Sequence, residues 1–108
     1  MTEGAFPTSG KAYEIFFAEF GRHLGAARTI LKNPANLSSD DRFRLSASFH
    51  TIKGGAGFFG LSDIARISSI LEKLFKNPDL KVETEIFEIE GLIDELDSMG
   101  RLLPVPPK

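Results

Sequence analysis

Residues 49–60 read FHTIKGGAGFFG, and this stretch decides between two fold classes. Gly55, Gly57 and Gly60 have the Gly-x-Gly-x-x-Gly spacing of a dinucleotide-binding loop. Such a loop must follow a buried strand and open a helix. The preceding residues, RFRLSASFHTIK, have a helical period instead, and the acid about twenty residues later, Asp79, follows no predicted strand. We therefore interpret the stretch as part of a helix and reject the nucleotide-binding reading.

This helix is predicted to begin near Ser38 or Ser39 and to stop at Gly60, a residue type that commonly ends helices. Negative charge in its first turn suits the helix dipole. Its apolar residues follow a 4-3-4-3 spacing, which predicts a seam facing a core. The seam consists of Leu45, Phe49, Ile52, Ala56 and Phe59. Phe58 lies beside the seam, and the sequence leaves open whether it packs against the next loop or stays exposed for a partner.

Three further segments have the same helical period, approximately residues 9–32, 62–76 and 82–103. Ser9 and Ser62 are the expected N-caps of the first and second of these helices. Asn-Pro pairs end the same two helices, because a residue before proline disfavours the α region. Four helices with short connections predict an all-α fold, an antiparallel up-down four-helix bundle.

The bundle is expected to occupy residues 1–103, and the proline-rich residues 104–108 are expected to form a flexible tail or the stub of a linker. Two glycines of the first helix, Gly21 and Gly25, either weaken it or allow close packing against a neighbour. His23, on the same helix, is interpreted as an ordinary surface or flank residue. The many acidic residues of the last helix are interpreted as solvated surface.

Composition excludes several classes of function. A net charge of −2 lacks the basic footprint of a nucleic-acid binder. Without cysteine there is neither a disulfide nor a thiolate metal site, and the two histidines lack metal-ligand spacing. No apolar run approaches the ~20 residues of a membrane span. We expect a cytoplasmic protein with no bound cofactor or metal, and with neither nucleic acid nor membrane as partner.

His50 lies away from the apolar seam on a helical wheel, on the same side as Lys53, Gly54 and Gly57. Glycine inside a helix is costly, and three of them occur within residues 54–57. Close approach by another protein would explain this bare surface around the imidazole. A nucleophilic ring nitrogen beside a lysine indicates a site for a phosphoryl group carried on histidine.

The stretch His50–Gly60 resembles the signature of histidine-containing phosphotransfer (HPt) domains. It is most similar to the phosphoacceptor domain at the N-terminus of chemotaxis-type histidine kinases. Residues 70–72, Ile-Leu-Glu, extend the likeness into the next helix. The resemblance implies a helical bundle that carries a phosphoryl group and passes it to, or takes it from, an aspartate on a receiver domain.

The resemblance also implies roles for individual residues. His50 would be phosphorylated, Lys53 would stabilise the phosphoryl oxygens, and Gly54 would clear the approach of the partner. Glu72 would bond the imidazole and set its tautomer, while Lys76 would add positive charge nearby. Mg²⁺ and the acceptor aspartate would belong to the receiver.

The sequence leaves open the architecture of the whole protein and whether the domain transfers a phosphoryl group. The chain is either a free-standing shuttle or the phosphoacceptor domain of a histidine kinase whose ATP-binding part lies elsewhere. The partners would be a receiver domain and a kinase catalytic domain. The alternative function is a helical docking module that binds a receiver or a kinase without phosphotransfer.

Overall fold

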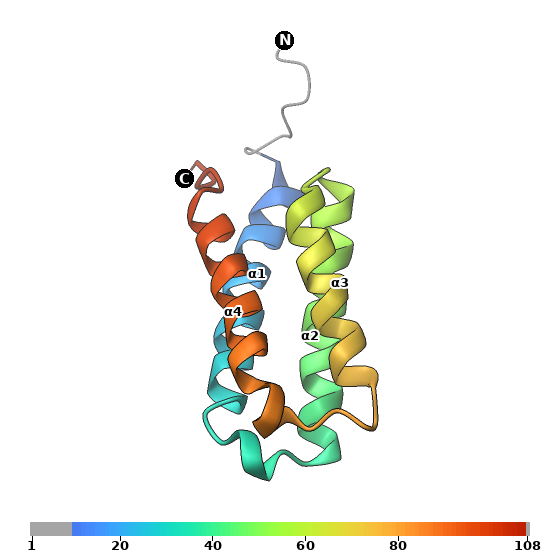
Figure 1. Ribbon diagram of the computed structural model, residues 1–108. Helices are drawn as coiled ribbons and strands as arrows, with labels where there is room; N and C mark the ends of the chain where they lie inside the picture. Colours follow the sequence, from blue (N-terminus) through green and yellow to red (C-terminus); the bar gives the residue numbers. More distant parts are fainter. Residues whose placement is uncertain (1–9, 108) are drawn as a thin grey trace.

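The computed structural model describes residues 10–107 of the chain, and within them it contains four α-helices and one short 3-10 helix. In chain order these are α1 (Lys11–Ile30), η1 (Pro34–Asn36), α2 (Ser39–Phe58), α3 (Ser62–Lys76) and α4 (Val82–Arg101). Consecutive α-helices run in opposite directions (Figure 1). The predicted all-α, antiparallel up-down bundle is confirmed.

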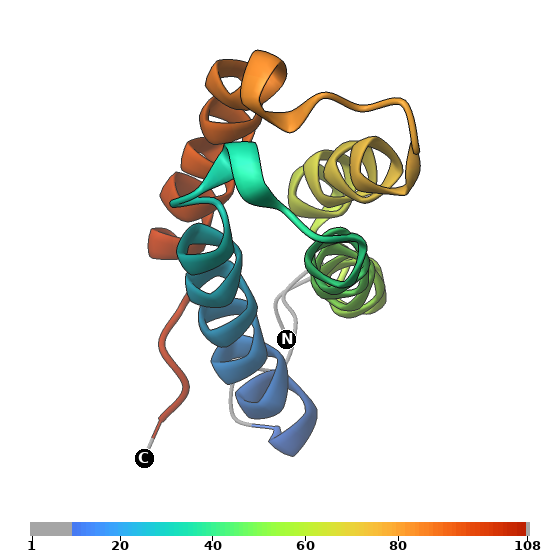
Figure 2. The same ribbon diagram turned by 90° about the horizontal axis from the view of Figure 1, so that it is seen from below.

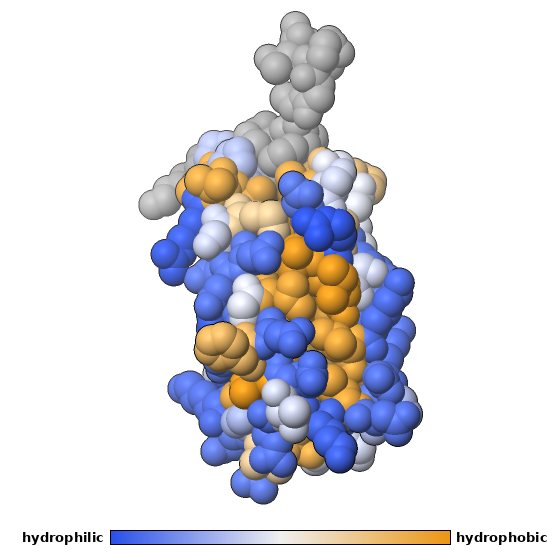
Figure 3. All heavy atoms as spheres, viewed as in Figure 1, coloured by the Kyte–Doolittle hydropathy of each residue, from blue (hydrophilic) through white to orange (hydrophobic). Residues whose placement is uncertain are grey.

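The four helices surround one core, and the closest packing is between α2 and α3. Seen along the bundle, α2 and α3 lie together on one side, and α1 and α4 on the other (Figure 2). Apolar residues of all four helices form the core, and in the predicted seam of α2 Phe59 alone is only partly buried. Apolar side chains also reach the surface in a band along the face that α3 and α4 form (Figure 3). No helix in residues 10–107 has both the length and the apolarity to cross a membrane.

Both ends of α2 are fixed by local hydrogen bonds. At the start, the Asp41 N–H donates to Ser38 Oγ and the Ser38 N–H donates to the Asp41 carboxylate, which together make a capping box. At the end, the Leu61 N–H donates to the Ala56 carbonyl at 2.8 Å. This bond closes over Gly60, whose φ of 71° lies in the left-handed region. The predicted stop at Gly60 is therefore confirmed, and α2 holds His50 on a well-defined helix.

The N-terminal ends of α3 and α1 differ from the expected N-caps in different ways. The N-cap of α3 is Leu61, and Ser62 is the first helical residue, so the expected cap at Ser62 was wrong by one position. The Leu61 N–H already closes the end of α2 on the Ala56 carbonyl, so Leu61 alone separates Gly60 from α3 and takes the cap position. The cap expected at Ser9 lies outside the described residues; α1 begins at Lys11, with Gly10 at its N-cap.

The glycines of α1 do not pack closely against a neighbour. A Cβ added to Gly21 or Gly25 would meet no atom within 4 Å, so the packing alternative was wrong. Close packing occurs instead at Gly100 of α4, where a Cβ would overlap the ring of Phe20. The proposed boundary at residue 103 stays a prediction, although the Tyr13 hydroxyl donates to the carbonyl of Pro104 just beyond it.

Candidate functional site

His50 lies on the outer face of α2, where its side chain is 66% exposed. Its Nδ1 lies 2.8 Å from Oε2 of Glu72, which projects from the neighbouring helix α3. The side-by-side packing of α2 and α3 brings together two residues that are 22 positions apart in the sequence. The contact that the resemblance implied between the imidazole and the acid is present in the structure.

Glu72 is the central group of the site because its side chain is only 4% exposed and three cationic or polar groups contact it. Nζ of Lys53 lies 2.8 Å from Oε1, and Nζ of Lys76 lies 2.8 Å from Oε2. The close ion pairs with Lys53 and Lys76, with the hydrogen bond from His50, lower the pKa of Glu72 from 4.5 to about 2. The carboxylate therefore stays ionised at every physiological pH.

An ionised carboxylate can only accept hydrogen bonds, and this fixes the tautomer of neutral His50. Nδ1 must carry the hydrogen that is donated to Glu72, so the lone pair lies on Nε2. Nε2 forms no hydrogen bond with any residue between 10 and 107. The site thus presents a ring nitrogen that is free to attack an electrophile from solvent or from a partner.

The charges around this nitrogen favour an anionic ligand. Glu72 contributes one negative charge and the two lysines contribute two positive charges, so the cluster carries a net charge of +1. The side chain of Lys53 is 36% exposed and that of Lys76 is 63% exposed. Both ammonium groups therefore remain accessible to an anion held on the exposed imidazole.

The glycines near His50 divide into two kinds. A Cβ on Gly54 or Gly57 would meet nothing within 4 Å, so these two positions form open surface as expected. A Cβ on Gly55 would lie 2.5 Å from Cδ1 of Phe16 in α1. The inference that all three glycines bare the surface for a partner was wrong for Gly55, because Gly55 is required for the contact between α1 and α2.

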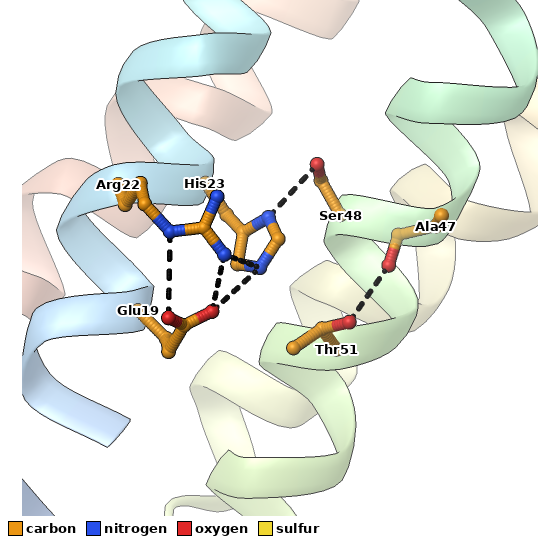
Figure 4. A network of polar contacts seen from close by, with 6 residues as sticks. All are labelled: Glu19, Arg22, His23, Ala47, Ser48 and Thr51. Carbon is orange, nitrogen blue, oxygen red and sulfur yellow. Dashed lines mark hydrogen bonds and ion pairs between the residues drawn. The ribbon is translucent and has the colours of Figure 1, made fainter. Parts of the chain in front are cut away.

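His23 belongs to a polar network that the sequence did not reveal (Figure 4). Its Nδ1 lies 3.0 Å from Ser48 Oγ on α2, and its Nε2 lies 3.1 Å from Glu19 on its own helix. The side chain is only 15% exposed, so of the two expected positions, surface or flank, His23 occupies the flank. Both ring nitrogens are engaged, in contrast to His50, and the network links α1 to α2. The i,i+4 spacing could have predicted the contact of His23 with Glu19, but not the contact with Ser48 on another helix.

The sequence left open whether Phe58 packs against the next loop or stays exposed, and the structure shows it exposed. Phe58 is 77% exposed, beside the partly buried Phe59.

No group of three or more His, Asp or Glu side chains within residues 10–107 could hold a metal ion.

Comparison with known proteins gave one result. A family model described as the Hpt domain matches residues 11–99, which is most of the chain. No curated protein and no solved structure matches the chain significantly.

Proposed function

The chain belongs to the Hpt domain family, and from that premise we propose that His50 is the residue that carries its phosphoryl group. Membership makes the chain a histidine phosphotransfer domain of a phosphorelay, a phosphoryl carrier rather than a catalyst. Domains of this family interact with receiver domains and kinases. One observation supports this role for His50: its ring is mostly exposed, but Nδ1 contacts the buried, ionised carboxylate of Glu72.

The transfer step follows from the tautomer. The lone pair on Nε2 attacks the phosphorus of the donor and a P–N bond forms. The bond between phosphorus and the donor's leaving atom breaks, and its electron pair stays on that atom. The ring keeps its Nδ1 hydrogen and becomes cationic, so the carboxylate of Glu72 stabilises it across the 2.8 Å contact. The reverse steps pass the phosphoryl group to a carboxylate oxygen of the receiver aspartate.

Lys53 and Lys76 are the residues that we propose for the phosphoryl oxygens. In the unphosphorylated domain both ammonium groups pair with Glu72. A phosphoryl group on His50 adds negative charge within reach of the flexible lysine side chains. Each ammonium group can then pair with the phosphoryl oxygens as well as with the carboxylate of Glu72. Gly54 and Gly57 leave the surface beside the imidazole free of side chains, which favours close approach of the receiver.

The wider setting is also part of the proposal. We expect Mg²⁺ to be held by the receiver's carboxylates, so that the domain itself needs no cofactor. The likeness of residues 50–60 to chemotaxis-type kinases supports the phosphoacceptor domain of such a kinase, with the ATP-binding part in another segment; a free-standing shuttle is the alternative. A cytoplasmic location is expected, because receivers and their phosphodonors meet there.

Two histidines in the chain make the test simple. The small donor phosphoramidate, or a phosphorylated receiver, should label the wild type at an acid-labile site. His50→Gln should abolish labelling, whereas His23→Gln, the matched control, should retain it. Labelling that survives His50→Gln, or that disappears in a folded His23→Gln variant, would overturn the assignment.

A further inference from the structure

Two exposed phenylalanines lie on the same helix as His50, one on either side of it along the chain. Phe43 is 71% exposed and Phe58 is 77% exposed. Phe43 precedes His50 by seven residues, which puts it within about 20° of the imidazole on the helical wheel, and Phe58 lies about 80° away, towards α1. The two rings are separated by about 22 Å of helix.

The surface between these two rings is nearly free of side chains. Ala47, Gly54 and Gly57 are exposed and lie between them on the outer side of α2. We call Phe43, Ala47, His50, Gly54, Gly57 and Phe58 the docking stripe. Single exposed apolar residues are common on protein surfaces, but two of the three exposed phenylalanines within residues 10–107 lie on this one stripe.

Phe58 also borders a groove and is held in place. Its ring packs edge to face against Phe59 with the centroids 5.0 Å apart, and Phe59 in turn contacts Tyr13 and Phe16. The groove, of about 300 Å³, lies between α1 and α2 and is lined by Ile15, Phe16, Thr51, Gly55 and Phe58 among others. Ile15 on α1 is 55% exposed beside it. A large apolar side chain of a partner can fill this space without rearrangement of the core.

We propose that Phe43 and Phe58 are specificity-determining anchors for a receiver domain, which contacts both rings while its aspartate reaches His50. This inference rests on the proposed role of His50. Aromatic side chains bury large apolar areas and dominate the energetics of many interfaces. The residues between them are small, so a partner that rests on both rings can approach the imidazole closely.

Charge favours a receiver as the occupant over other proteins. The pocket that holds Mg²⁺ and the acceptor aspartate must be rich in carboxylates. The cluster beside the stripe, Lys53, Lys76 and Glu72, has a net charge of +1 and complements it. Any protein that takes the phosphoryl group from His50 must also cover this part of α2, so the stripe is continuous with the site of transfer.

The experiment compares Phe43→Ala, Phe58→Ala and the double variant with Phe87→Ala. Phe87, on α4, is 88% exposed and is the matched control because it lies on a different helix from His50. Each domain is first labelled with phosphoramidate, which needs no protein docking and reports whether His50 is intact. Transfer is then measured to the receiver that wild type serves fastest in a panel from the same organism.

The single variants should transfer about tenfold more slowly at subsaturating receiver, and the double variant more slowly still, as for loss of aromatic anchors. Phe87→Ala should match wild type, and all four variants should accept label equally. Transfer by the double variant at the wild-type rate would overturn this inference without affecting the proposed role of His50. Failure of labelling in wild type would instead refute the role of His50.

Discussion

Nδ1 of His50 and Oε2 of Glu72 lie 2.8 Å apart, and this contact joins the exposed surface of α2 to a buried carboxylate on α3. An exposed histidine would otherwise exchange its ring hydrogen between two nitrogens. Here the acid selects one tautomer and also balances the charge that the ring acquires on phosphorylation. The reactivity of the exposed residue is therefore set by a side chain that solvent hardly reaches.

Replacing Glu72 by Gln should slow phosphorylation of His50 by about 10- to 100-fold, the value of one hydrogen bond to a charged group. The amide can still contact Nδ1, but it does not carry the charge that stabilises a phosphorylated ring, and its NH₂ can select the opposite tautomer. The measurement is the initial rate of labelling with phosphoramidate. Glu88→Gln, at an exposed position of α4, is the control and should label like wild type. Equal rates for the two variants would contradict the role given to Glu72.

The same residue should make stability depend on acid pH. The pKa of Glu72 in the folded chain, about 2, lies below its ordinary value of 4.5. Its contribution is therefore fully present above about pH 4.5 and is lost as the pH falls towards 2; the size is at most about 3 kcal/mol. Urea unfolding at pH 7 should show Glu72→Gln to be less stable than wild type, and the gap should narrow between pH 4.5 and 3. A gap that stays constant over this range would show that the carboxylate is not stabilised by its partners.

The two lysines should differ in their effect on transfer. Lys53 is one turn from His50 on α2 and is less exposed than Lys76, so its charge is less screened by water. Lys53→Gln should lower the rate of transfer to a receiver about tenfold, less than the roughly 100-fold or more for loss of a fully enclosed electrostatic contact to a transition state, because its ammonium is partly exposed. Lys76→Gln should cost a smaller factor. Lys73→Gln is the control, since Lys73 forms no ion pair with the described residues. A larger loss for Lys76 than for Lys53 would reverse the assignment.

His23 should matter for the fold and not for phosphorylation. Its contact with Ser48 joins α1 to α2, so His23→Ala should lower the free energy of unfolding by about 1 kcal/mol. Ser48→Ala removes the same contact. In a double-mutant cycle, the double variant should lose less free energy of unfolding than the two single variants lose together, because both remove the same interaction. Strict additivity, or slower labelling of His50 in a folded His23 variant, would contradict a purely structural role.

Much of the fold and of the site was readable because it depends on local pattern. Helical period predicted all four helices, and Gly60 predicted the end of α2, where only a residue tolerant of positive φ fits. The helical wheel grouped Lys53 with His50 and a resemblance added Glu72, and the structure brings these three side chains together. Spacing within α2 alone could place Lys53 beside His50, but it could not have located the acid on another helix.

Most of the errors arose where a residue's neighbour comes from a distant part of the chain; the misplaced cap at Ser62 is the exception. Gly54 and Gly55 are adjacent in sequence and point in directions about 100° apart, so one faces solvent and the other faces α1. Which of them meets a ring depends on how α1 lies across α2, and no local pattern encodes that. The same reason hid the contact between His23 and Ser48.

These adjacent glycines give a matched pair of variants. Gly54→Ala should stabilise the fold by up to about 1 kcal/mol, because alanine is the better helix former and its Cβ meets no atom. Gly55→Ala should destabilise it by about 1–3 kcal/mol, because the Cβ would force the buried Phe16 ring aside. Both values come from urea unfolding at pH 7. A bulkier change, Gly54→Leu, should keep the fold and phosphoramidate labelling but slow transfer to a receiver, since it occupies the surface that the partner must approach. If Gly54→Leu transferred at the wild-type rate, the open surface beside His50 would not be where the receiver docks.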